Sequence, residues 1–413
     1  MNQQPKSKQN ILNEVQAMRP VNGVRLGVAA THIKYKNRDD ILLLELSENT
    51  QTATVFTKND FCAAPVIVGR ENVRKATPRY LLVNAGNANA GTGEQGVIDA
   101  RLCCEAVASI VNCDPEQVIP FSTGVIGEHL KVDRITNVLP AAVAGLKTEN
   151  WVAACMAIMT TDTVPKGISR SCEIDGHKIT VTGIAKGAGM IQPNMATMLS
   201  YIATDAGIAQ GLLQSTLQQL ADQTFNRITV DGDTSTNDAC VLMATGESSL
   251  PLIENEQNPN YASVRNCLYE VFEYLAVSII RDAEGATKLI NVIVDEGGDP
   301  AECAQVAYAV ANSPLVKTAL FASDPNWGRI LAAIGRAGLK NLDINKVRID
   351  VNGVRIVSDG ARDKTYSEEA GSQAMKQEEI SINIYLGRGS SRANVWTCDL
   401  SYDYVKINAE YRS

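Results

Sequence analysis

The segment 186–200 combines residue types that could cut their own backbone. It begins at Lys186 and Gly187, passes Pro193, and enters an apolar run that contains Thr197. Glycine permits backbone angles that other residues avoid, and proline fixes an extended approach, so the segment predicts a turn that feeds a β-strand. A hydroxyl at such a turn can attack the peptide bond that precedes it.

Attack by the Thr197 hydroxyl on the Ala196 carbonyl would give an ester through an N-to-O acyl shift. Hydrolysis of that ester would leave Thr197 as a new N-terminus. An α-amino group has a pKa close to neutrality, so it can act as general base toward the adjacent hydroxyl. One residue would then supply both nucleophile and base. The spacing alone also fits an ordinary loop followed by an ordinary strand threonine.

The scarcity of histidine favours such a self-contained nucleophile. The chain has His32, His129 and His177, and none lies beside a recognisable nucleophile turn such as Gly-x-Ser-x-Gly. The glycine-rich segment 85–93 lacks both common nucleotide-binding signatures, and the acidic segment 231–242 lacks the glycine and glutamate of an EF-hand. We therefore expect no resident cofactor and no metal.

Ordered motifs along nearly the whole chain make it similar to the ornithine acetyltransferase family, the glutamate N-acetyltransferases of arginine biosynthesis. The motifs lie at residues 122–127, 159–163, 186–199, 282–288, 323–330 and 405–413. One departure is Ser413, where a threonine is common in the family. The resemblance implies self-cleavage between Ala196 and Thr197, which would give an α chain of residues 1–196 and a β chain of residues 197–413.

The same resemblance implies an acyltransferase that moves acetyl from N2-acetyl-L-ornithine to L-glutamate by a ping-pong route through acetyl-Thr197. Use of acetyl-CoA as a further substrate would make the enzyme bifunctional, and the family suggests an α2β2 heterotetramer of the two cleavage products. Two alternatives stay open at this point. One is a self-processing aminopeptidase or amidase, in which water accepts the acyl group. The other is a noncatalytic protein whose glycine loops hold a metabolite.

Site residues follow from the resemblance as well. Thr123 and Gly124 would form the oxyanion hole, because a tetrahedral intermediate needs preorganised donors. Lys186 would hold a substrate carboxylate or lower the pKa of the new N-terminus, and Glu284 would bind the amino group of ornithine. The full set of implied substrate contacts is Thr160, Lys186, Thr197, Glu284, Asn408 and Ser413. Contacts so near the C-terminus imply a tail that is ordered over the site.

Composition narrows the classes of partner. With 413 residues, 45% of them hydrophobic, the chain can bury a large core. A formal charge of −8 and a pI near 5.2 argue against nucleic acid or anionic membrane as main partners and favour small molecules. The polar start has no apolar signal region, and the ten cysteines form no Cys-x-x-Cys pair, so we expect a cytoplasmic protein.

The elements that must position these residues alternate between strand and helix. Period-two patterns predict short strands within 24–57 and a core strand at 80–84. Apolar residues at helical spacing predict helices over 98–110, 213–224 and 264–279, each with its stripe turned to the core. The alternation indicates an α/β fold. The resemblance implies a layered sandwich of sheets between helices, of the ornithine acetyltransferase and self-processing aminopeptidase type.

Overall fold

The computed structural model describes residues 7–192 and 198–410, and the chain divides into two compact units. Unit 1 comprises Met1–Asn226 and Thr234–Ile279, and unit 2 comprises Arg227–Asp233 and Ile280–Ser413. No helix among the described residues is long and apolar enough to span a membrane.

Unit 1 contains two β-sheets. The first is four-stranded, with the order β1-β2-β4-β5, and consists of β1 (Val24–Ala29), β2 (Ile41–Leu46), β4 (Tyr80–Asn87) and β5 (Val118–Val125). The second is five-stranded, with the order β3-β9-β8-β7-β6, and consists of β3 (Gln51–Phe56), β9 (Ala239–Ala244), β8 (Leu199–Thr204), β7 (His177–Lys186) and β6 (Lys166–Ile174). The strands predicted within 24–57 and at Tyr80 are confirmed.

The two sheets of unit 1 pack face to face. Successive residues of a strand point to opposite sides of its sheet, so neighbouring residues of β2 belong to different buried clusters. Leu42 and Leu44 of β2 belong to one buried cluster with Ile184 of β7 and Tyr201 of β8. The intervening Leu43 belongs to a second cluster, on the outer face of the first sheet. The helix α5 (Trp151–Ala157) also contributes to the cluster between the sheets.

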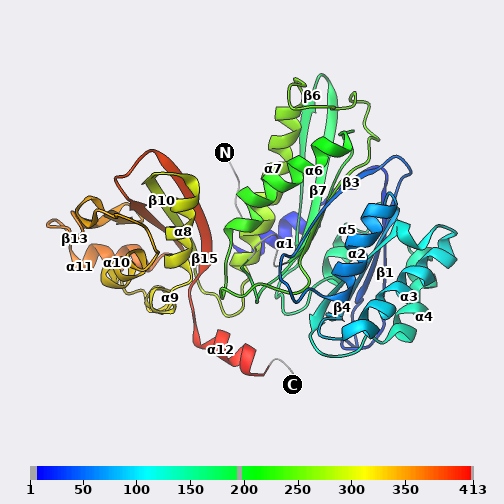
Figure 1. Ribbon diagram of the computed structural model, residues 1–413, viewed down its shortest axis with the longest axis horizontal. Helices are drawn as coiled ribbons and strands as arrows, with labels where there is room; N and C mark the ends of the chain where they lie inside the picture. The colour runs from blue at the N-terminus through cyan, green and yellow to red at the C-terminus, as the bar shows by residue number, and fades with distance from the viewer. Residues whose placement is uncertain (1–6, 193–197, 411–413) are drawn as a thin grey trace. The chain divides into compact units, whose positions relative to one another are not determined.

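Helices form the outer layers of unit 1 (Figure 1). On the first sheet lie α2 (Ala64–Lys75), α3 (Gly93–Val111) and α4 (Val132–Ala144). On the second sheet, α6 (Gln210–Gln223) packs on β3 and β9, and α7 (Tyr261–Arg281) packs through Val271 and Leu275 against Gly183 of β7. A short helix, α1 (Lys8–Gln16), lies on β6. The layered α/β sandwich is confirmed.

The predicted core stripe of α3 is wrong, although the helix exists. Ile98, Leu102 and Ile110 are 45%, 42% and 40% exposed. The helix instead buries smaller residues, Ala100, Cys103, Cys104, Val107 and Ala108, against the first sheet. Small side chains let a helix lie close to the sheet and between two neighbouring helices, so size outweighed hydrophobicity in choosing the buried face. The stripe of α7, from Val264 to Ile279, is fully buried as predicted.

The second sheet joins strands from both sides of residues 193–197. β8 pairs antiparallel with β7, with Lys186 opposite Leu199, and pairs parallel with β9 on its other edge. β3, β7 and β6 precede this segment in the chain, and β8 and β9 follow it. Two strands from the C-terminal side are therefore enclosed by strands from the N-terminal side.

Unit 2 is built on one six-stranded sheet with helices packed on it. Its strand order is β13-β12-β11-β14-β10-β15, from β10 (Leu289–Gly297), β11 (Arg348–Val351), β12 (Val354–Ser358), β13 (Ala361–Arg362), β14 (Glu379–Tyr385) and β15 (Ser391–Cys398). The helices α8 (Pro300–Ala311) and α11 (Glu368–Met375) pack on this sheet, and the unit also contains α9 (Pro314–Phe321), α10 (Trp327–Gly335) and α12 (Tyr402–Ala409). Alternate β10 residues such as Val292 meet Val306 and Val310 of α8 in the core.

Candidate active site

The turn at the carboxyl ends of β4 and β5 requires glycine. These strands run parallel, and Gly124 lies opposite Gly86 in their register. Gly124 has a φ of +134°, and a Cβ atom on it would lie 2.2 Å from the Gly86 carbonyl carbon. Any larger residue would push the two backbones apart. The sequence thus fixes the direction of the Gly124 peptide group.

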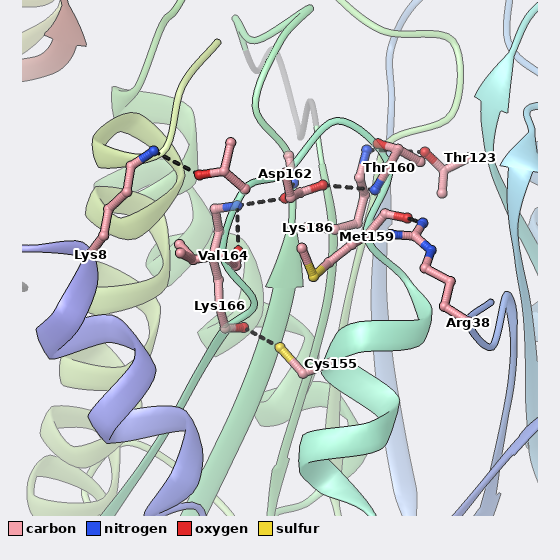
Figure 2. A network of polar contacts seen from close by, with 12 residues as sticks. Lys8, Arg38, Thr123, Cys155, Met159, Thr160, Asp162, Val164, Lys166 and Lys186 are labelled. Carbon is pink, nitrogen blue, oxygen red and sulfur yellow. Dashed lines mark hydrogen bonds and ion pairs between the residues drawn. The ribbon is translucent and has the colours of Figure 1, made fainter. Parts of the chain in front are cut away.

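Thr123, the residue before that glycine, is joined to the end of β7. The Lys186 ammonium donates to the Thr123 hydroxyl, with 3.1 Å between Nζ and Oγ1 (Figure 2). Thr123 is only 7% exposed, so little water competes for it. A hydroxyl that accepts from a cation keeps its own hydrogen for donation, and the charge polarises that O–H group. The pair can therefore stabilise negative charge that develops on a reacting oxygen.

Asparagine side chains hold the backbone around this turn. Asn84 donates to the Asn87 carbonyl oxygen at 2.8 Å and accepts from the Ser122 hydroxyl. Asn237 donates to the carbonyl oxygens of Ala88, at 2.6 Å, and of Ser122, at 2.9 Å. Buried amides with matched partners fix one backbone conformation. These bonds connect the glycine-rich loop after β4 to the oxyanion turn.

Asp162 connects three segments next to Lys186. Its Oδ2 atom accepts from the Thr160 N–H at 2.9 Å, and its Oδ1 atom accepts from the Gly187 N–H at 2.8 Å and from the Lys166 ammonium at 2.5 Å. Burial alone would raise the pKa of Asp162, but the charges of Lys166 and Lys186 and the Gly187 N–H hold it well below its usual range. The group is therefore a carboxylate at neutral pH.

Arg38 binds the residue that precedes Thr160. Its guanidinium donates to the Met159 carbonyl oxygen (Figure 2) and lies 3.7 Å from the centre of the Tyr35 ring. Burial raises the pKa of Tyr35 above its usual value, and the Arg38 charge opposes part of that rise. A long loop between β1 and β2 thus helps to fix the Thr160 segment.

Asp238 is a second buried carboxyl group in unit 1. It precedes β9, and the next residue, Ala239, donates its N–H to the Met198 carbonyl oxygen at 3.0 Å. Burial raises the pKa of Asp238 well above its usual value, and the Ser235 side chain and the Lys186 charge oppose part of that rise. Burial therefore favours the protonated form of this acid. Its Oδ2 atom has no hydrogen-bond partner among the described residues.

Glu284 and Asn408 meet in unit 2. The Asn408 side-chain amide donates to the Glu284 carboxylate at 2.9 Å and to the Tyr404 carbonyl oxygen at 3.0 Å. The Ser401 hydroxyl donates to the Gly285 carbonyl oxygen at 2.6 Å, and a Cβ on Gly285 would lie 2.5 Å from the Tyr404 backbone nitrogen. The tail is thus ordered through α12 and is held against the Glu284 turn.

The predicted site residues form three groups. Two lie in the part of the chain that the structure describes, and the third lies outside it. Unit 1 brings Thr123, Gly124, Thr160 and Lys186 together through the bonds above, and unit 2 brings Glu284 to Asn408. Ala196, Thr197 and Ser413 lie outside the described residues. No group of three or more potential metal-binding side chains occurs among residues 7–192 and 198–410.

Sequence reasoning missed Asp162 and Asp238 as parts of this region. The signal for Asp162 was its place inside the 159–163 motif, four residues before Lys166. Asp238 ends the acidic run 231–238, whose pattern resembles only an incomplete calcium loop. Nothing in either pattern indicates that the carboxyl group is buried.

Comparisons with known proteins agree with the motifs. The model of the ArgJ family matches residues 25–413. The arginine biosynthesis bifunctional protein ArgJ of Methylococcus capsulatus is 56% identical over 394 residues, which cover 95% of this chain and 96% of the relative. The protein of the same name from Pseudomonas syringae pv. tomato is 53% identical over 402 residues, which cover 97% of this chain and 99% of the relative.

A solved structure of a protein with the same name is also similar to part of this chain. The crystal structure of the arginine biosynthesis bifunctional protein ArgJ from Bacillus halodurans is 40% identical, with a TM-score of 0.50, and the match covers 52% of this chain and 99% of that chain. The family model spans most of the sequence, and the relatives share more than half of their residues with it. The chain therefore belongs to the ArgJ family.

Proposed function

We propose that this chain moves acetyl from N2-acetylornithine to glutamate through an acetyl ester on Thr197, and that acetyl-CoA serves as a second acetyl donor. The names of its relatives, bifunctional proteins of arginine biosynthesis, support the proposal. The single observation that carries it is the bond from Lys186 to Thr123, because it joins the start of the cleavage segment to the oxyanion turn.

The first step is processing of the backbone. The Thr197 hydroxyl attacks the Ala196 carbonyl carbon, the C–N bond breaks, and water opens the resulting ester to give a carboxylate on Ala196 and a free amine on Thr197. The two ends of the intervening segment support this step: a Cβ on Gly187 would lie 3.4 Å from the Met198 Cβ. The segment leaves and rejoins the sheet at one place, next to Lys186.

Acetyl transfer then uses the new N-terminus. The Thr197 α-amino group takes the hydroxyl proton as the oxygen attacks the acetyl carbon of acetylornithine. The Thr123 hydroxyl and the Gly124 N–H stabilise the negative oxygen of the tetrahedral intermediate. Its collapse breaks the bond to nitrogen, and the α-amino group returns the proton to the departing ornithine. The amine of glutamate attacks the acetyl ester in the same way and leaves as N-acetylglutamate.

The remaining site residues orient the substrates. Both substrates carry an α-carboxylate, for which Lys186 supplies a cation and Thr160 a hydroxyl. Glu284 binds the amino group of ornithine. The Asn408 side chain orients the Glu284 carboxylate by donating to one of its oxygens. The two cleavage products stay associated, and we propose an α2β2 assembly of them.

Intact-mass measurement of purified protein tests the first step. We expect two fragments, the second of which begins at Thr197, and a single uncut, inactive chain for Thr197→Ala. Incubation with acetylornithine alone should add one acetyl group to the C-terminal fragment, and varying both substrates should give parallel double-reciprocal lines. Active protein of full-length mass would refute the processing step. Release of acetate with no N-acetylglutamate would indicate an amidase instead.

A further inference from the structure

The Asp162 carboxylate receives hydrogen bonds from three parts of unit 1. Thr160 N–H belongs to the loop after α5, Gly187 N–H follows β7, and Lys166 begins β6. Figure 2 shows the carboxylate between Lys166 and Thr160, with Lys186 beside them. The implied substrate contact at Thr160 and the start of the cleavage segment are thus fixed to one side chain.

Only a carboxylate satisfies all of these donors. Its two oxygens accept from two backbone N–H groups and one ammonium. A neutral amide has one accepting oxygen and a donating NH2 group, so asparagine would turn a donor toward a donor. Full burial of the Asp162 and Lys166 side chains leaves no water to relieve that mismatch.

Lys166 makes the buried charge tolerable. A carboxylate without a counter-ion at a fully buried position is strongly destabilising, whereas removal of both partners of such a pair is often tolerated. The Lys166 ammonium also donates to the Val164 carbonyl oxygen at 3.3 Å.

We propose that Asp162 is a positioning residue, neutralised by Lys166, that fixes the Thr160 segment to the start of the cleavage segment at Gly187. The inference rests on the proposed function and adds to it. Asp162 acts through other residues, first on self-cleavage by anchoring one end of the segment, and then on acetylornithine binding by holding Thr160.

Three variants separate positioning from stability: Asp162→Asn, Lys166→Met, and the double variant. Asp162→Asn should slow self-cleavage about 10²-fold, as expected when a reacting segment shifts by about 1 Å, and should lower the unfolding midpoint. Lys166→Met should lower the midpoint too, but should cleave within about tenfold of wild type because the two backbone bonds to Asp162 remain. The double variant should regain stability relative to Asp162→Asn and still cleave slowly.

Cell-free synthesis with timed sampling measures cleavage, and kinetics on the matured protein measure the second role. In the double variant, KM for acetylornithine should rise about tenfold, the factor that one lost contact carries. Asp205→Asn is the matched control. Asp205 is also a buried carboxyl in unit 1, 6% exposed, and accepts from the Thr180 N–H at 2.8 Å near the other end of β7. This control should cleave as fast as wild type, because the bond to the Thr180 N–H holds neither Thr160 nor Gly187.

A double variant that regains both stability and cleavage would show that the pair is only structural and would overturn the proposal. Hydrogen exchange at the Thr160 and Gly187 amides decides the anchoring without any activity. Exchange at both should be faster in the double variant than in wild type, and unchanged exchange contradicts the proposal. If wild-type protein transfers no acetyl, the proposed function fails on its own, and the exchange result still tests the role of Asp162.

Discussion

Gly124→Ala tests the oxyanion turn most directly. A Cβ on Gly124 would lie 2.2 Å from the Gly86 carbonyl carbon and 2.5 Å from the Asn87 nitrogen. Ordinary contact begins at 3.4 Å, so β4 and β5 must separate by about 1.2 Å at this point. The φ of +134° adds strain for any L-residue, about 1 to 3 kcal/mol.

A displacement of this size moves the Gly124 N–H away from the reacting oxygen. Loss of one oxyanion donor lowers kcat by about 10² to 10³-fold, or roughly 3 to 4 kcal/mol. We therefore expect Gly124→Ala to reduce the turnover of acetylornithine by that factor. Steady-state kinetics on the processed protein measure the rate, and urea unfolding measures the loss of stability separately.

Gly127→Ala is the matched control, only three residues along the chain. Gly127 also has a positive φ, +85°, but a Cβ on it would meet no heavy atom within 4 Å among the described residues. The control should lose stability through backbone strain and keep its turnover number. Equal turnover numbers for Gly124→Ala and wild type would refute the role of the turn. Equal losses in both variants would assign the effect to strain rather than to the displaced donor.

Three further predictions concern single side chains. Thr123→Ala should lower kcat about 10²-fold with little change in KM, whereas Thr123→Ser keeps the hydroxyl and should stay near wild type in a steady-state assay. Burial raises the pKa of Asp238, so the wild-type protein loses stability as the pH rises above the ordinary carboxyl value. The unfolding free energy of Asp238→Asn, measured in urea, should therefore increase relative to that of wild type between pH 5 and pH 8. If the variant is much less stable than wild type at both pH values, the carboxyl is ionised. The Lys166 and Lys186 charges hold the pKa of Asp162 below its usual range. The stabilising effect of the carboxylate is therefore complete above about pH 4 and declines as the pH falls further. The difference in unfolding free energy between wild type and Asp162→Asn should shrink in acid, and a constant difference would contradict this.

Local patterns predicted the elements with strong periodicity and failed where packing decided. The α7 stripe from Val264 to Ile279 is buried because its apolar residues occupy one face alone. On α3, apolar residues lie on two faces. The face with smaller residues such as Ala100 is buried, and Ile98 and Leu102 are exposed. No strand of the unit 2 sheet was predicted, and the two-residue β13 shows how weak a local signal such strands carry.

The site was predictable by motif and not by contact. Thr123 and Lys186 were both proposed, but their bond joins residues 63 positions apart. Asp162 reaches Gly187 across 25 positions, and the sequence records neither that separation in space nor the burial of the carboxylate. Asp162 and Lys166 are only four residues apart, but the burial of their ion pair depends on how strands from distant segments pack around it, which local propensity does not determine.

The order β3-β9-β8-β7-β6 has a consequence for how the active protein is made. A cut between Ala196 and Thr197 would turn one continuous sheet into an interface in which β9 and β8 of one fragment lie between strands of the other. In either fragment alone, backbone N–H and C=O groups at the edges of those strands would lack partners. Exposed edges of this kind promote aggregation. The uncut chain folds in a unimolecular reaction, whereas separated fragments would have to find each other at a rate set by their concentration. Processing would therefore act as a one-way step: the cut protein is preserved by slow unfolding rather than by easy refolding, and fragments expressed separately should reassemble poorly.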